Sequence, residues 1–175
     1  MKKFIRRAGV AVAGLAVGAL VMGGVAYAFP MAFGGTVANV QRDLTETAPW
    51  AAPLAAVWTN VPSTAIPVSV PDGQSRIVES TFGAESVCQQ AGWCSLRVIA
   101  IDGAGVVTEF SPVVGLDFAY DSPAGGPKEQ HAMHRVQRLG EGNYTVLVQA
   151  QIAGAGGGSQ FILDDYTHFV DVILP

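Results

Sequence analysis

The 175-residue chain is poor in charged side chains, which make up 14% of it, while half of its residues are hydrophobic. Disordered chains show the opposite balance, so this composition excludes disorder for most of the length. Residues 1–28 hold four of the ten basic residues and no acidic one, so the rest carries six basic and 14 acidic residues, a net charge of −8. With Lys128 as its single lysine, that region lacks the basic surface that nucleic acids and anionic lipids require.

The N-terminal residues have the order of parts found in a secretory signal peptide. Four basic residues precede an apolar run at 8–25, and Ala26 and Ala28 form the small-residue site that signal peptidase cleaves. We therefore predict a helical signal peptide at 1–28, cleavage after Ala28, and a secreted, extracellular or periplasmic location. An uncleaved anchor is the alternative, and the pair Arg6–Arg7 leaves the twin-arginine route open beside general secretion.

Cysteine is scarce, with only Cys88 and Cys94 in the chain. A zinc site would need further ligands, and a redox pair usually has two residues between its cysteines rather than five. An even cysteine count in an exported chain instead predicts a structural disulfide. A bridge around so short a loop should add about 2–2.5 kcal/mol of stability, which fixes a loop rather than the whole domain.

Helical patterns are absent, because no stretch of 12 residues shows an apolar stripe with caps. This excludes parallel α/β folds, which need crossover helices to cover their sheets. Short segments that read as strands alternate instead with turn signals rich in Pro, Gly, Asp and Asn. The predicted strands are 54–59, 65–70, 75–82, 96–101, 106–110, 114–120, 130–139, 144–152, 160–163 and 166–174.

Alternation of apolar and polar residues is clearest at 144–152 and predicts one buried and one exposed face. The length leaves room for one domain. We therefore predict an all-β protein, a single antiparallel β-sandwich or barrel over 62–175. Residues 29–61 are interpreted as a lead-in segment that lies against this body, with a short polar stretch at 41–46.

Several segments resemble a group of secreted bacterial β-sandwich domains that have no assigned activity. These segments are 82–88 (FGAESVC), 93–98 (WCSLRV), 101–103 (IDG) and 116–122 (LDFAYDS). The pieces 142–146 (GNYTV) and 161–166 (FILDDY) are similar to the closing strands of jelly-roll carbohydrate-binding modules. The resemblance spans 62–174 and implies a jelly-roll-like sandwich and, for function, recognition of carbohydrate.

Aromatic rings beside carboxylates predict where a sugar would bind. Trp93 lies in the loop between the cysteines, and Asp117, Tyr120 and Asp121 lie at the edge of another loop. A flat ring held on a fixed loop, with acceptors for hydroxyl groups nearby, is a plausible binding feature. The alternative for Trp93 is that its indole folds over the disulfide and closes the end of the core. Further flat rings are those of Trp50, Trp58 and Tyr144.

Asp164 and Asp165 are the predicted metal ligands, because adjacent carboxylates supply the oxygen atoms that calcium prefers. The alternative is that they cap backbone N–H groups or face solvent, and no other cofactor is predicted. His131 and His134 are three residues apart, which puts them on opposite faces of a strand and argues against a shared metal. His168 belongs to a different predicted strand, and only the fold decides whether it meets either of them.

Three functions remain open from these features. The leading prediction is a secreted, non-enzymatic module that binds carbohydrate or a cell-surface polymer, without a nucleic-acid partner and without membrane contact after signal cleavage. The second is a structural protein, a homo-oligomer that self-associates through apolar sheet faces and through the apolar residues Phe29, Met31 and Phe33. The third is an envelope hydrolase built on Ser, His and Asp, although the G-x-S-x-G and H-E-x-x-H motifs are absent.

Overall fold

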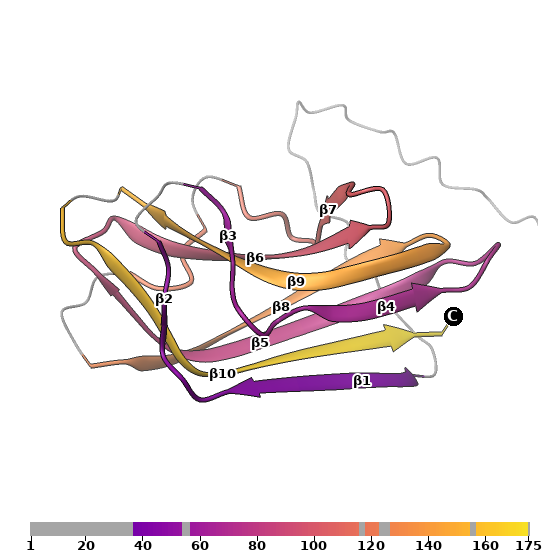
Figure 1. Ribbon diagram of the computed structural model, residues 1–175, viewed down its shortest axis with the longest axis horizontal. Helices are drawn as coiled ribbons and strands as arrows, with labels where there is room; N and C mark the ends of the chain where they lie inside the picture. The colour runs from indigo at the N-terminus through magenta and orange to yellow at the C-terminus, as the bar shows by residue number, and fades with distance from the viewer. Residues whose placement is uncertain (1–36, 54–56, 116–117, 123–126, 155–156, 175) are drawn as a thin grey trace, which may run out of the picture. The chain divides into compact units, whose positions relative to one another are not determined.

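The computed structural model describes residues 37–53, 57–115, 118–122, 127–154 and 157–174, with side chains from Glu46 onward. These residues form ten strands, and none of them form a helix (Figure 1). The strands are β1 (Val37–Glu46), β2 (Trp50–Ala51), β3 (Thr59–Asn60), β4 (Ile66–Val70), β5 (Arg76–Gln89), β6 (Trp93–Asp102), β7 (Val107–Glu109), β8 (Glu129–Leu139), β9 (Gly142–Ala153) and β10 (Gln160–Ile173).

Two features predicted near the N-terminus lie outside the described residues. One is the signal peptide at 1–28, and the other is the apolar group Phe29, Met31 and Phe33. Within the described residues there is no helix of the length and apolarity needed to cross a membrane. The predicted export of the chain therefore stays a prediction from its sequence.

The strands form two antiparallel sheets that enclose one core. The first sheet has the order β1-β10-β5-β8, with β2 also paired to β10. The second sheet has the order β3-β9-β6-β7, with β4 also paired to β9. Figure 1 shows the two layers facing each other, with β5 and β10 in one and β6 and β9 in the other. The prediction of an all-β antiparallel sandwich is confirmed.

The pairing of strands is nested in the way that defines a jelly roll. The outermost pair is β1 with β10, followed inward along the chain by β4 with β9, β5 with β8, and β6 with β7. Each of these pairs is antiparallel, so the chain resembles a long hairpin folded over itself into two sheets. This arrangement is the double Greek key of jelly-roll folds.

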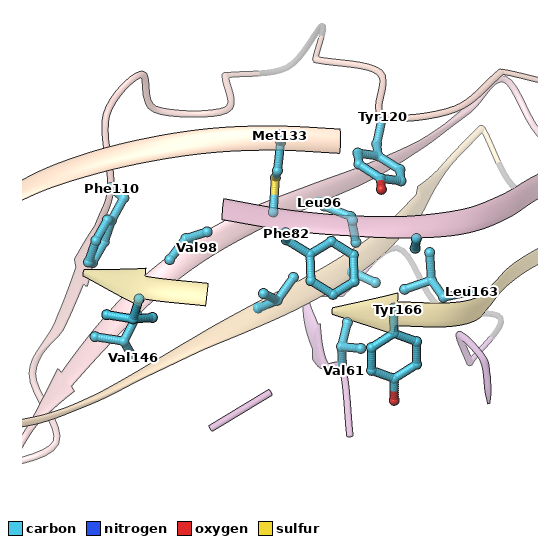
Figure 2. Close-up of a cluster of buried hydrophobic side chains, with 14 of the residues drawn as sticks. Val61, Phe82, Leu96, Val98, Phe110, Tyr120, Met133, Val146, Leu163 and Tyr166 are labelled. Carbon is cyan, nitrogen blue, oxygen red and sulfur yellow. The ribbon is translucent and has the colours of Figure 1, made fainter. Parts of the chain in front are cut away.

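The core follows from the two-residue period of the strands, because alternate side chains face the opposite sheet. In β5 the even-numbered residues from Val78 to Cys88 are buried, and in β9 the same holds from Val146 to Ile152. Figure 2 shows rings of the first sheet (Phe82, Tyr166) and of connecting segments (Phe110, Tyr120) meeting aliphatic side chains of the second sheet in this core. The buried face predicted for 144–152 is confirmed from Val146 onward, while Tyr144 is partly buried at its end.

The disulfide between Cys88 and Cys94 is present and joins the two sheets. Cys88 lies near the end of β5 in the first sheet, and Cys94 lies at the start of β6 in the second. Both sulfur-bearing side chains are buried in the core cluster. The bridge therefore fixes a crossing from one layer to the other, where backbone pairing between consecutive strands is lost.

Several strand predictions differ from the structure. The predicted strands 160–163 and 166–174 form one strand, β10, and of 54–59 only Thr59 among the described residues lies in a strand. The polar stretch 41–46, interpreted as part of a lead-in segment, belongs to β1, which pairs with β10. Within the described residues β1 has a partner on one side only, and polar sequences suit such an edge position. The described parts of 114–120 contain no strand, although Asp121 makes an isolated bridge to Cys94.

Candidate functional site

The structure places Trp93 and Asp121 on neighbouring backbone segments, because Cys94 pairs with Asp121, but the surroundings of their side chains differ. Trp93 is the first residue of β6, and its side chain points away from the core because that of the next residue, Cys94, points into it. The indole is half-buried on the outer face of the second sheet. Asp121 instead accepts a hydrogen bond from Ser86 of the first sheet. Asp117 lies outside the described residues.

Tyr120 belongs to the core rather than to the surface. Tyr120 is 6% exposed, and its ring packs against that of Phe82 (Figure 2) and against those of Phe161 and His131. Its hydroxyl donates a hydrogen bond to the backbone oxygen of His131 over 2.6 Å, and burial raises the pKa of this hydroxyl above its usual range. The predicted role of Tyr120 as a stacking surface is therefore corrected, because a ligand has no access to its ring.

Ser86 joins Asp121 and His131 in a hydrogen-bonded chain at the rim of the sandwich. Its Oγ lies 2.9 Å from Oδ2 of Asp121 and 2.8 Å from Nδ1 of His131. The single hydroxyl proton goes to the carboxylate, so the imidazole must donate its own Nδ1 proton to the serine. In a hydrolytic triad the histidine stands between serine and acid and accepts the serine proton. The order at Ser86 is different, and His131 does not act as its base.

A second serine–histidine pair lies inside the core. Ser80 donates to Nε2 of His168 over 2.9 Å, and Nδ1 of that ring donates to the backbone oxygen of Thr64 over 2.7 Å. Both side chains are fully buried. Desolvation lowers the pKa of His168 to about 4, partly offset by its bond to Thr64, so the ring is neutral at pH 7. No substrate reaches this pair, and its hydrogen bonds satisfy the polar atoms of the buried imidazole.

The three histidines lie in three different places. His168 is in the core and His131 is at the rim, whereas His134 is exposed on the outer face of the first sheet, 3.6 Å from a carboxylate oxygen of Glu79. The sequence prediction that His131 and His134 would occupy opposite faces of one strand is confirmed. The described histidines therefore do not converge on one cleft.

Asp164 and Asp165 lie at an irregularity in β10. The register with β5 shifts between Asp164 and Thr167, and Asp165 has a φ of 42°, which indicates a bulge. Asp164 forms an ion pair with Lys128, which lowers the pKa of its carboxyl group. Among the described residues no three side chains of His, Cys, Asp or Glu cluster in a way that would hold a metal ion.

A hollow of about 300 Å³ lies over the central strand β9, and we call it the β9 hollow. Strands β4 and β6 flank β9 there, and two rows of paired residues line it. Its lining consists of Pro67, Val68, Ser69, Ile101, Asp102, Gly103, Asn143, Tyr144 and Thr145. By contrast, the space beside Asp121 has a volume of about 10 Å³, enough for a single water molecule and too small for a sugar.

The shape of the β9 hollow follows from the side chains in each row. In the first row Thr145 lies between Pro67 and Ile101, so a short hydroxyl side chain has an apolar wall on each side. In the second row Asn143 is paired with Ser69, and the neighbouring Gly103 has no side chain to fill the space. Alternation along the strands places these residues on the face turned away from the core.

Polar groups in the β9 hollow are held in fixed positions. The Ser69 hydroxyl donates to Oδ1 of Asn143 over 2.7 Å, which leaves the amide nitrogen as a donor toward the hollow. Asp102 accepts backbone N–H bonds from Ala104 and Val106 and so keeps the adjacent turn closed. Within the described residues the Thr145 hydroxyl has no hydrogen-bond partner.

Trp58 lies on the same outer face of the second sheet, but its ring is partly occupied. The guanidinium carbon of Arg97 is 4.5 Å from the centre of the indole, a cation–π contact. Arg97 also donates to Gln149 over 2.9 Å and to Glu109 over 3.0 Å. Trp50, by comparison, packs against the core. Neither indole presents both of its faces to solvent.

Sequence reasoning identified Tyr144 but missed the residues that shape the β9 hollow. The alternation of residues in β9 places the Thr145 side chain on the face opposite to the buried side chains, so its exposure could be predicted from the sequence. The contribution of Pro67 and Ser69 could not be predicted in this way, because it depends on the pairing of β4 with β9, which are more than 70 residues apart in the sequence. Tyr144 itself folds over Gly142, and its hydroxyl lies 3.2 Å from the backbone oxygen of Gly140.

A scan against protein-family models and a search of curated proteins found no match for this chain. Its function is therefore inferred from the geometry of the described residues and from the chemistry of its sequence.

Proposed function

We propose that this protein is an exported, non-enzymatic binding module whose β9 hollow takes a sugar unit of a carbohydrate or cell-surface polymer. The observation that carries the proposal is the combination of apolar walls with a polar floor in one concave space. Its volume of about 300 Å³ is at the lower end of the range for small-molecule sites.

A sugar ring is amphipathic, with C–H groups on its faces and hydroxyl groups at its edge, and the β9 hollow has matching parts. Pro67 and Ile101 offer apolar contact to the C–H groups. Thr145 and Asn143 offer a hydroxyl and an amide nitrogen to the ring hydroxyls. Because these groups lie on paired strands, little conformational entropy is lost on binding.

Charge favours a neutral ligand over an anionic one. The region after residue 28 carries a net charge of −8, and Asp102 lines the hollow. An anionic polymer would be repelled by this field, whereas a neutral polysaccharide would not. Export is supported by the signal-peptide pattern at 1–28 and by the disulfide between Cys88 and Cys94, a bond typical of oxidising compartments.

Titration of the isotope-labelled protein with a panel of neutral oligosaccharides, followed by NMR, tests the proposal. Shifts should concentrate at amides of β4, β9 and the β6–β7 turn. Thr145→Val keeps the shape of the residue and its preference for strands but removes the hydroxyl, and it should weaken binding by about tenfold.

Trp93→Ala serves as the matched control on the same outer face and should leave affinity unchanged, since Trp93 does not line the β9 hollow. If Trp93→Ala abolishes binding while Thr145→Val does not, the ligand binds at the indole and the β9 hollow is the wrong site. Absence of binding to every oligosaccharide at millimolar concentration would overturn the proposed function itself.

A further inference from the structure

Strand β8 has a hydrogen-bonded partner on one side only. It pairs with β5 along its whole length, from Glu129 to Leu139. On its other side the described residues contribute a single bridge, between Val136 and Ser111. This leaves 129–135 as a regular edge of seven residues. Of the devices that prevent further pairing at protein edges, 129–135 lacks a proline, a bulge and a lysine, and its charged residues, Glu129 and Arg135, stand at its two ends.

The direction of the free backbone groups is fixed by the bridge to Ser111. The N–H and C=O groups of Val136 both bond to Ser111 and so point away from β5. Residues of the same parity, which are Gln130, Ala132 and His134, therefore also direct their backbone groups outward. The side chains of these three residues are exposed on the outer face of the first sheet.

Arg135 at the end of this edge is a buried cation with no direct ion-pair partner among the described residues, although Glu109 interacts with it electrostatically. Its side chain is on the inward face of β8, is 7% exposed, and packs on the ring of Phe118 at 4.5 Å. One guanidinium nitrogen donates to the backbone oxygen of His134, while Nε has no hydrogen-bond partner in the described residues. Nor does Arg135 form an ion pair within them. A buried guanidinium N–H without a partner is costly and calls for an acceptor.

We propose that a second copy of this chain pairs with β8 in antiparallel fashion about a two-fold axis at Ala132, which joins the first sheets of two molecules into one. This inference concerns assembly and is independent of the proposed ligand site. In this register Ala132 faces Ala132 of the second copy, and Gln130 faces His134. Three outward pairs that each exchange two backbone bonds give about six new hydrogen bonds.

The same register gives Arg135 a directly opposed acid. It places Glu129 of the second copy directly opposite Arg135, on the same face of the joined sheet. The Glu129 carboxylate is exposed, with 64% of its side chain accessible, and its contact with Nε2 of His131 is a long one of 3.9 Å that would be exchanged for Arg135. Symmetry makes this contact twice. The bridge at Ser111 and the proline at Pro127 limit the paired segment at its two ends.

Ala132→Pro tests the interface without disturbing the fold, because the N–H that it removes points away from β5. The full sequence is expressed, and the protein is purified with whatever N-terminus remains after processing in the expression host. We expect the wild type to be a dimer by multi-angle light scattering and Ala132→Pro to be a monomer. Val107→Pro, on an edge of the second sheet whose N–H also points outward, is the matched control and should stay dimeric.

Glu129→Arg gives a second test that does not depend on proline, since Glu129 is exposed and its replacement leaves the core intact. It would place arginine opposite arginine, and we expect the dissociation constant of the dimer to rise at least about tenfold. Glu129→Gln should raise this constant less. A wild type that is monomeric at every concentration overturns the proposal. So does a dimer that persists in both Ala132→Pro and Glu129→Arg, because its interface must then lie elsewhere.

Discussion

Strand β5 carries two serines, Ser80 and Ser86, that each bond to a histidine, and the two pairs differ only in their surroundings. Their hydrogen bonds are nearly equal, at 2.9 Å to His168 and 2.8 Å to His131. The inner pair is sealed between the sheets, and the backbone oxygen of Thr64 accepts a hydrogen bond from the single N–H of the neutral imidazole. The outer pair lies at the rim, where the serine donates to the carboxylate of Asp121.

This difference shows that a short serine–histidine bond does not by itself make a reactive serine. The inner serine donates to a histidine that could act as a base, but no substrate has access to it. The outer serine is itself buried but its two partners are partly exposed, and it donates its hydrogen bond to the acid in place of the histidine. Reactivity requires both access and the right order of groups, and each pair lacks one of these.

The largest expected effect is the loss of the inner histidine. His168→Ala would leave a cavity beside Phe82 and two polar groups, the Ser80 hydroxyl and the Thr64 carbonyl, without partners. We expect the free energy of unfolding in urea to fall by about 3–4 kcal/mol. His131→Ala at the rim is the control and should cost about 1 kcal/mol or less. Equal losses in the two variants would mean that the inner pair is not sealed.

Acid should destabilise the protein through the inner pair. The folded protein holds the pKa of His168 at about 4, against 6.5 for an unperturbed imidazole, so below pH 6.5 the unfolded chain binds a proton that the folded one refuses. The contribution of His168 to the free energy of unfolding is fully present above pH 6.5. It falls as the pH decreases to 4 and then stays constant. The loss is on the order of 3 kcal/mol.

Urea unfolding at a series of pH values measures this slope, and NMR titration of the imidazole signals assigns it. His168→Gln keeps a donor and an acceptor in the core but does not titrate, and it should remove the slope between pH 6.5 and 4. A midpoint near 6.5 for His168 in the folded protein would contradict the prediction.

The sequence predicted the sandwich because its strands carry a clear two-residue period and its turns carry Pro, Gly, Asp and Asn. Strand β1 was missed because its sequence contains polar residues, which suit an edge strand, and lacks the two-residue period of a core strand. The sequence prediction also divided β10 at Asp164 and Asp165, because a bulge interrupts the alternation without ending the strand. Local patterns fail where a strand is exposed or irregular.

The candidate site was less predictable than the fold, and for a physical reason. Trp93 and Asp121 lie on neighbouring backbone segments because Asp121 pairs with Cys94, but the Asp121 carboxylate accepts a hydrogen bond from Ser86 of the first sheet, which the sequence does not predict. Tyr120 was predicted as a surface ring because it ends the predicted strand 114–120 at the edge of a loop, yet the described part of this segment is not a strand and its backbone directs the ring into the core. Such directions depend on pairing across the sheets, which one sequence does not show.

Reduction of the disulfide should affect the outer pair and spare the inner one. Cys88 lies two residues beyond Ser86 on β5, whereas Ser80 is several residues farther from the disulfide, toward the centre of the strand. Replacing both cysteines with serine should lower the free energy of unfolding by about 2–2.5 kcal/mol, the entropy of a short closed loop. The NMR signals of His131 should shift, while those of His168 should stay in place, and mass spectrometry confirms the absence of the bridge.

The smallest expected effect is the loss of the outer serine, and it decides whether the rim is hydrated. Ser86→Ala removes a donor to Asp121 and an acceptor for His131, both of which are only partly buried, so water can replace the hydroxyl. We expect a loss of about 1 kcal/mol in urea unfolding. Ser80→Ala makes the same change in the core, where water has no access, and should lose about 2 kcal/mol. If the two variants lose equal stability, burial does not distinguish the pairs, and the difference in their chemistry must come from the acid at Asp121 alone.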